Sequence, residues 1–108
     1  MASNERGPGP EAGASGVRLL WWSGALDMET AESLYARADA EPPGERLVLD
    51  LSRVTFMDSM GLNVLLRISQ ERQLVITGPL QDQVRYVLQI TEADTVLTVQ
   101  PSKEAMGG

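Results

Sequence analysis

Apolar and polar residues follow two alternating patterns along the chain, one typical of strands and one typical of helices. Residues 17–22 alternate with a period of two, and residues 46–51, 74–77 and 95–99 are short apolar runs, so each segment predicts a strand. Between these runs, apolar residues recur at helical spacing and predict three buried helix faces. These faces comprise Ala31, Leu34, Tyr35 and Ala38, then Leu62, Leu65, Leu66 and Ser69 with Val64 and Ile68 on a neighbouring face, then Leu80, Val84, Val87 and Leu88.

The resulting order alternates strands with helices and ends on a strand. Such alternation predicts an α/β domain with a largely parallel or mixed sheet covered by helices. We assign residues 17–100 to this domain. Residues 1–16 are rich in Gly, Pro, Ala, Ser and Glu and hold too little apolar surface to offset their ordering entropy, so they predict a flexible tail. Residues 101–108 predict a frayed end.

Local signals predict where several elements begin and end. Gly24 predicts a turn after the first strand, and Asp27 predicts a cap for the helix that follows. Pro79 suits the first position of the third helix. Trp21 and Trp22 point to opposite faces of the first strand, so we expect one to lie in the core and one to face outward.

The composition excludes several chemistries. The 108 residues contain no cysteine and no histidine, which removes disulfides, thiolate ligands, the commonest zinc ligand and the commonest general base. A net charge of −6 disfavours binding to phosphate backbones, so we expect no nucleic-acid partner. The chain has neither an apolar run of membrane-spanning length nor a secretory signal pattern. We therefore expect a cytoplasmic protein without membrane insertion that is not an enzyme and binds no metal or cofactor.

The most informative segment is residues 47–66, with the sequence LVLDLSRVTFMDSMGLNVLL. An apolar strand ending at Asp50 is followed by a predicted loop and then by Asp58-Ser59-Met60-Gly61 at the start of a helix. Ser59 is expected at or near the helix N-cap, where its hydroxyl can accept a backbone N–H bond. Gly61 permits close approach of another backbone or an unusual φ.

Other interpretations of this segment remain open. Ser59 can be a cap and nothing more, since Asp and Ser commonly precede apolar helices. Asp50 and Asp58 could form a carboxylate pair for metal binding or acid–base chemistry, although no histidine, cysteine or third acid joins them in the segment. A response-regulator receiver would also place an acid near Asp50, but the acidic pair expected after its first strand is replaced by Trp-Trp-Ser-Gly.

Residues 48–62 resemble the signature of STAS domains, specifically the anti-sigma factor antagonists. That signature is an apolar strand, D-L-S, and then F-[IM]-D-S-[ST]-G-L leading into a helix. Residues 23–27 resemble the family's G-E-L-D turn, and residues 74–91 resemble its later strand and helix. The resemblance covers residues 17–99 and implies a sheet of four to five strands with helices mainly on one face. Met60 stands where the family has a second hydroxyl, and Ala25 stands in place of its Glu.

The resemblance also implies a partner-switching function. An unphosphorylated antagonist of this family binds an anti-sigma factor that is itself a serine kinase, and so releases a sigma factor for transcription, often in a stress response. Phosphorylation of the serine after the motif's Asp, here Ser59, switches binding off, and a serine phosphatase restores it. The implied partner-binding residues are Asp27, Asp58, Ser59, Met60, Gly61, Leu62 and Asn63. The alternative with the same fold is a STAS module that does not switch, such as a transporter-associated subunit or a stress-signalling scaffold.

Overall fold

The computed structural model describes residues 16–100. Its strands are β2 (Val17–Leu26), β3 (Arg46–Met57), β4 (Leu74–Thr77) and β5 (Thr98–Gln100). Its helices are α2 (Ala31–Asp39), α3 (Ser59–Glu71) and α4 (Asp82–Ile90), and the short 3₁₀ helix η1 (Ala93–Thr95) precedes β5. The predicted tail at 1–16 and the predicted frayed end at 101–108 fall outside the described residues, apart from Gly16.

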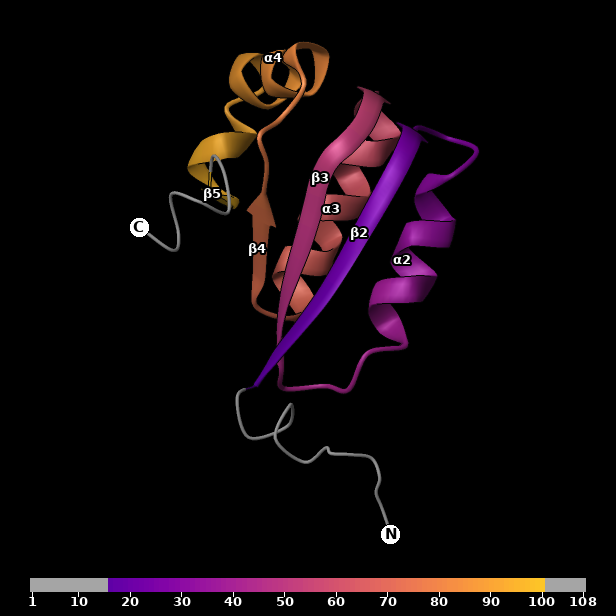
Figure 1. Cartoon of the computed structure of the whole chain (residues 1–108), viewed down its shortest axis with the longest axis vertical. Helices are drawn as coiled ribbons and strands as arrows, with labels where there is room; N and C mark the ends of the chain where they lie inside the picture. Colours follow the sequence, from indigo (N-terminus) through magenta and orange to yellow (C-terminus); the bar gives the residue numbers. More distant parts are fainter. Residues whose placement is uncertain (1–15, 101–108) are drawn as a thin grey trace, which may run out of the picture.

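The strands form one sheet in the order β2-β3-β4-β5, seen face-on in Figure 1. All pairings between the described strands are parallel. Parallel neighbours require a long crossover connection, and a helix supplies each one here. The α/β prediction and the predicted number of strands are therefore confirmed.

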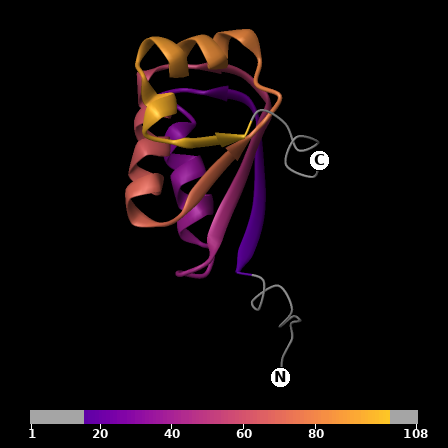
Figure 2. The ribbon, with the colours of Figure 1, turned by 90° about the vertical axis from the view of Figure 1, so that its left-hand side faces the viewer.

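Helices α2 and α3 cover one face of the sheet, and α4 lies across its end (Figure 2). Leu47, Leu49 and Leu51 of β3 are fully buried, as expected for alternate residues that point at the helix layer. The core therefore lies between the sheet and the α2–α3 pair. Its other fully enclosed side chains include Leu26, Leu34, Val54, Leu65, Ile68 and Ile76.

Strands β2 and β3 run further than the sequence pattern predicts. The predicted turn at Gly24 is wrong, because Gly24 has φ +85° and lies beside a register shift inside β2. The predicted end of β3 near Asp50 is also wrong, since the strand continues to Met57. The extension exists because β2 keeps pairing with β3 beyond the end of β4, up to Leu26 opposite Met57.

Two further boundaries differ from prediction. Helix α4 starts at Asp82 with Gln81 as its N-cap, so Pro79 is not its first residue. Strand β5 starts at Thr98 because residues 93–95 form η1 instead. The prediction of one core tryptophan is confirmed: Trp22 packs against the core, whereas Trp21 is exposed on the opposite face.

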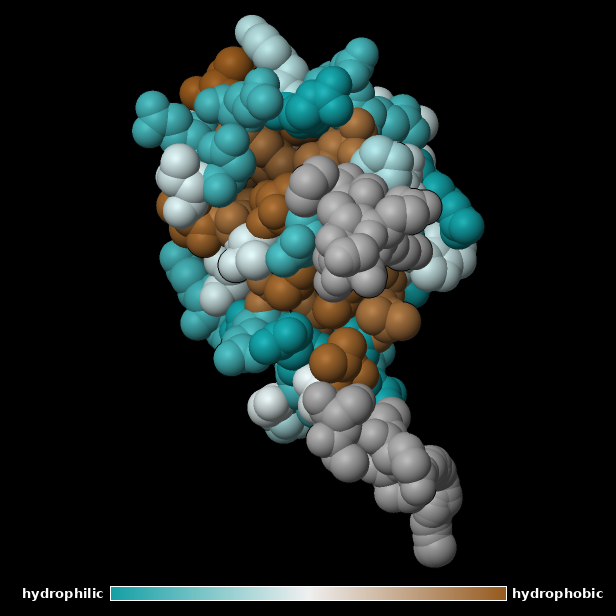
Figure 3. All heavy atoms as spheres, turned by 60° about the vertical axis from the view of Figure 1, so that its left-hand side comes forward, coloured by the Kyte–Doolittle hydropathy of each residue, from teal (hydrophilic) through white to brown (hydrophobic). Residues whose placement is uncertain are grey.

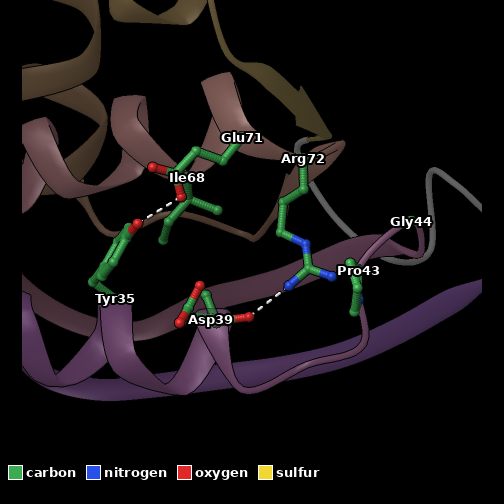
Figure 4. A pocket seen from close by; sticks show the side chains of 8 residues that line it. Tyr35, Asp39, Pro43, Gly44, Ile68, Glu71 and Arg72 are labelled. Atoms are coloured by element: carbon green, nitrogen blue, oxygen red, sulfur yellow. Dashed lines mark hydrogen bonds between the residues drawn. The ribbon is translucent and has the colours of Figure 1, made fainter.

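The end of α3 far from Ser59 is tied to α2 by side chains (Figure 4). Arg72 donates to the backbone carbonyls of Ala38, Glu41 and Pro42 at the end of α2. The Tyr35 hydroxyl donates to the Glu71 carboxylate at 2.6 Å. These bonds enclose a hollow of only about 110 Å³ between the helices.

A larger hollow of about 420 Å³ lies between α4 and β5. Its lining residues are Pro79, Leu80, Arg85, Leu88, Gln89, Asp94 and Val99. Figure 3 shows apolar surface in the middle of this side of the molecule, with hydrophilic residues above and below it. The lining is mostly apolar and includes none of the residues that the sequence motif singles out.

Candidate functional site

The candidate site forms where β2 and β3 end side by side. Leu26 pairs with Met57, and the next backbone N–H, that of Asp58, donates to the Leu26 carbonyl at 3.3 Å. Asp27 and Asp58 therefore leave the same edge of the sheet, each as the first residue after its strand. Two predicted site residues that lie far apart in the sequence are thus brought together by strand pairing.

Asp58 is the N-cap of α3. Its backbone is extended, with φ −114° and ψ −172°, and its Oδ1 accepts from the N–H groups of Met60 (2.9 Å) and Gly61 (3.0 Å). The prediction that Ser59 lies at or near the N-cap is confirmed, but the side chain that caps the helix is that of Asp58 and not that of Ser59. Ser59 is the first residue of α3, one position later than the cap. Asp58 takes the role because β3 extends to Met57 and leaves Asp58 as the one residue between strand and helix.

The Ser59 side chain is consequently not used in capping. It is exposed, and no described residue forms a hydrogen bond with its hydroxyl. The nearest helix donors are already occupied by Asp58. A hydroxyl in this position is accessible to an enzyme that modifies it.

Gly61 seats the first turn of α3 directly on the end of β2. A Cβ at this position would lie 2.1 Å from the Leu26 carbonyl oxygen, far inside van der Waals contact. The predicted close backbone approach at Gly61 is confirmed. Leu62 is also buried, whereas Met60 and Asn63 are exposed. Gly61 and Leu62 therefore shape the site from inside, and Ser59, Met60 and Asn63 form its surface.

Asp27 organises the turn that enters α2. Its Oδ1 accepts from the N–H groups of Glu29 (3.0 Å) and Thr30 (3.2 Å). The N-cap of α2 is Thr30, so the prediction that Asp27 itself caps the helix is wrong. The Thr30 hydroxyl donates to the Ala25 carbonyl at 2.9 Å, which ties this turn to the end of β2.

Sequence reasoning missed two apolar residues of this surface. Met28 is 72% exposed, Phe56 is 44% exposed and Met60 is 44% exposed. Met28 lies in the Asp27 turn, and Phe56 lies opposite Ala25 at the end of β3. Val54 and Met57, which precede and follow Phe56 along β3, are both buried. Exposed apolar side chains beside a free hydroxyl and two acids are typical of a protein-binding surface.

Gln83 of α4 also reaches this site and was not predicted. Its side-chain oxygen accepts from the Met57 N–H at 2.7 Å, and its amide nitrogen donates to the Met57 carbonyl at 2.9 Å. Met57 is almost fully buried and directly precedes Asp58. No local pattern in the sequence points to this contact, because the two residues belong to different elements.

Residues 16–100 contain no group of three acidic, histidine or cysteine side chains arranged to hold a metal ion. The helices within them are each too short or too polar to cross a membrane.

Comparison with known proteins decides the family. The model described as "Mlab, STAS domain" matches residues 13–99, which is most of the chain. The chain belongs to the STAS domain family. The match begins inside the segment predicted as a tail and ends one residue before the predicted domain boundary. No curated protein matches the sequence.

Several solved structures resemble this one. An anti-sigma factor antagonist from Mycobacterium paratuberculosis is 31% identical, with a TM-score of 0.66 over 83% of this chain and 81% of that chain. A sulfate transporter family protein from Wolinella succinogenes is 17% identical, with a TM-score of 0.68 over 82% and 80% of the two chains. The SulP transporter STAS domain from Vibrio cholerae is 19% identical, with a TM-score of 0.63 over 83% and 77%. The two transporter structures share the fold with this STAS domain.

Proposed function

We propose that this STAS domain is an anti-sigma factor antagonist that acts in the cytoplasm and is switched by phosphorylation of Ser59. Its unphosphorylated form binds an anti-sigma factor that has serine kinase activity and thereby releases a sigma factor. The observation that carries the proposal is the exposed Ser59 side chain at the first position of α3, whose hydroxyl has no hydrogen-bond partner within residues 16–100. The similarity to the M. paratuberculosis antagonist supports it.

The proposed switch is a balanced group transfer. The kinase moves the γ-phosphoryl group of ATP to the Ser59 Oγ, which loses its proton, and ADP leaves. A serine phosphatase later uses water to break the new O–P bond, which returns the hydroxyl and releases inorganic phosphate. Neither step needs a catalytic group from this chain, in keeping with the absence of histidine and cysteine.

The position of Ser59 lets the fold tolerate the phosphate while the partner surface does not. A helix N-terminus favours a negative group through the helix dipole, although the N–H groups of Met60 and Gly61 already donate to Asp58. A phosphate carries about −1.5 to −2 charges. In a complex, this charge would be desolvated beside the Asp58 carboxylate and among the exposed side chains of Met28, Phe56 and Met60. A loss of about 3–4 kcal/mol would weaken binding roughly a hundred- to a thousandfold.

A comparison of Ser59→Ala with Ser59→Asp tests the proposal. Each variant is used to capture partners from the native cytosol, and the captured proteins are identified by mass spectrometry. We expect the Ala form to retain a kinase-type anti-sigma factor and the Asp form to release it. Ser33→Asp is the matched control, because it adds the same charge at an exposed position of α2.

The alternative function is a STAS module that does not switch, for example a transporter-associated subunit. The two transporter structures have the same fold, so the fold alone does not separate this function from the switching one. Equal capture of one partner by both Ser59 variants, or capture of transporter subunits, would replace the proposed function with this one.

A further inference from the structure

Strand β3 outruns its neighbour β4, and α4 compensates for the missing pairing. Strand β4 pairs with β3 only as far as Asp50 opposite Thr77, whereas β3 continues to Met57. Backbone groups on that side of the extension need other partners if they are buried. Two glutamines of α4 and its cap supply them: Gln81 donates to the Ser52 carbonyl at 3.2 Å, and Gln83 bonds to both backbone groups of Met57.

The Gln83 contact imitates a β-bridge. A primary amide presents a carbonyl acceptor and an N–H donor side by side, as a peptide unit does, so one side chain can satisfy both groups of a strand residue. The two distances, 2.7 Å and 2.9 Å, are those of good hydrogen bonds. The contact at Gln81 is a single, longer and exposed bond.

Met57 is the last residue before the Asp58 cap. Its backbone position therefore determines where Asp58 and the first turn of α3 lie. On the β2 side, the Leu26 carbonyl receives the Asp58 N–H and supports Gly61. On the α4 side, Gln83 holds Met57. The start of α3, with Ser59 on it, is therefore held from both sides.

We propose that Gln83 is a positioning residue for Ser59: its amide clamps Met57 and so presents Ser59 in the geometry that a kinase-type partner recognises. This inference rests on the proposed function. It assigns to α4 a role in the switch, although α4 contributes no residue to the predicted partner surface.

The clamp is first tested in the isolated protein by NMR. Gln83→Leu keeps the side-chain volume but removes both hydrogen bonds, and Gln81→Leu is the matched control. We expect amide hydrogen exchange at Met57 to accelerate about tenfold or more in Gln83→Leu, with backbone shifts that extend through Asp58 to Gly61. Unchanged exchange and unchanged shifts would overturn the clamp.

Gln83→Glu adds a pH readout that a packing role would not produce. The protonated carboxyl group can donate to the Met57 carbonyl and accept from its N–H, whereas the ionised form loses the donor. The clamp should form at low pH and disappear as pH rises through the pKa of the introduced carboxyl. The Met57 and Asp58 amide shifts should move from wild-type-like to Gln83→Leu-like along that titration. A flat titration at those two amides would contradict the clamp.

The role at Ser59 is then measured with the captured partner. We expect Gln83→Leu to weaken its binding, and to lower kcat/KM for Ser59 phosphorylation, by about tenfold, while Gln81→Leu stays within about twofold. Changed NMR shifts with unchanged affinity and phosphorylation would overturn the positioning role and leave the proposed function standing. Failure of the proposed function would appear separately, as equal partner capture by the Ser59 variants in the wild-type background.

Discussion

The two ends of α3 are anchored in opposite ways. At the N-terminal end, the anchors lie before the helix or on its inner side: the Asp58 carboxylate accepts from main-chain N–H groups of the first turn, and Gly61 rests on the Leu26 carbonyl. At the C-terminal end, the anchors are the side chains of the last residues themselves. Arg72 donates to the Ala38 carbonyl of α2, and Glu71 accepts from the Tyr35 hydroxyl of the same helix. One end therefore leaves its outer side chains unused, and the other uses them to hold the fold together.

This difference shows how a small domain can combine a binding surface with a stable helix. The Asp58 cap and the close approach of Gly61 to Leu26 fix the start of α3 without using the side chains of Ser59 and Met60, which are exposed. The Arg72 end uses its polar side chains in hydrogen bonds with α2 and the residues after it, beside a hollow of only about 110 Å³. We therefore expect substitutions at the C-terminal end to lower the free energy of unfolding and leave partner affinity unchanged. Substitutions of the exposed side chains at the N-terminal end should do the reverse.

The largest expected effect on stability is at Gly61, where α3 contacts the Leu26 carbonyl. Gly61→Ala places a methyl group 2.1 Å from the Leu26 oxygen, so α3 or β2 must shift. We expect a loss of about 3 kcal/mol in the free energy of unfolding, measured by urea denaturation. Ser59→Ala, in the same helical turn, is the control and should change stability by less than about 0.5 kcal/mol. A Gly61→Ala protein as stable as this control would contradict the account of the N-terminal end.

A smaller loss is expected at the opposite end. Arg72→Met removes the donors to the Ala38, Glu41 and Pro42 carbonyls and should cost about 2 kcal/mol in the same urea measurement. The affinity for a partner that binds at Ser59 should stay within about twofold of wild type under native conditions, because the Arg72 hydrogen bonds lie at the far end of the helix. If Arg72→Met abolished binding while the protein remained folded, the two ends would not be independent.

The smallest effect is a titration. The hydrogen bond to Glu71, followed by burial and the Glu71 charge, raises the pKa of Tyr35 above 10.0. The bond favours the protonated phenol, so its contribution to stability is present below pH 10 and is lost as pH rises through the higher pKa of the folded state. Absorbance titration in a Tyr86→Phe background, which leaves Tyr35 as the single tyrosine, should show the raised midpoint. Glu71→Ala should lower the Tyr35 midpoint toward 10. An unchanged midpoint in that variant would contradict the hydrogen bond between Tyr35 and Glu71.

The sequence predicted the kinds of elements well and their ends less well. Apolar periodicity located the helices and strands because burial imposes it directly, as Leu47, Leu49 and Leu65 show. The extension of β3 to Met57 depends on its pairing with β2, which no local window contains. That extension also decides which residue caps α3, because Asp and Ser are comparably good caps and only the end of the strand distinguishes Asp58 from Ser59.

The candidate site was predicted in its motif but not in its surroundings. Ser59, Asp58 and Gly61 were found because the segment resembles a family signature and because glycine has a specific steric use. Phe56 and Met28 were missed because exposed apolar residues carry no periodic signal. Gln83 was missed because its partner, Met57, lies on another element.

The parallel pairing of β2 with β3 also has a kinetic consequence. Each strand pair is joined through a helix, so its contacts close long stretches of chain and form more slowly than the contacts of a helical bundle. The surface around Ser59 combines the Asp27 turn, the end of β3 and the start of α3, so it does not exist until β2 and β3 have paired. During synthesis, a partner that reads this surface would ignore the nascent chain and recognise it only after the sheet has closed.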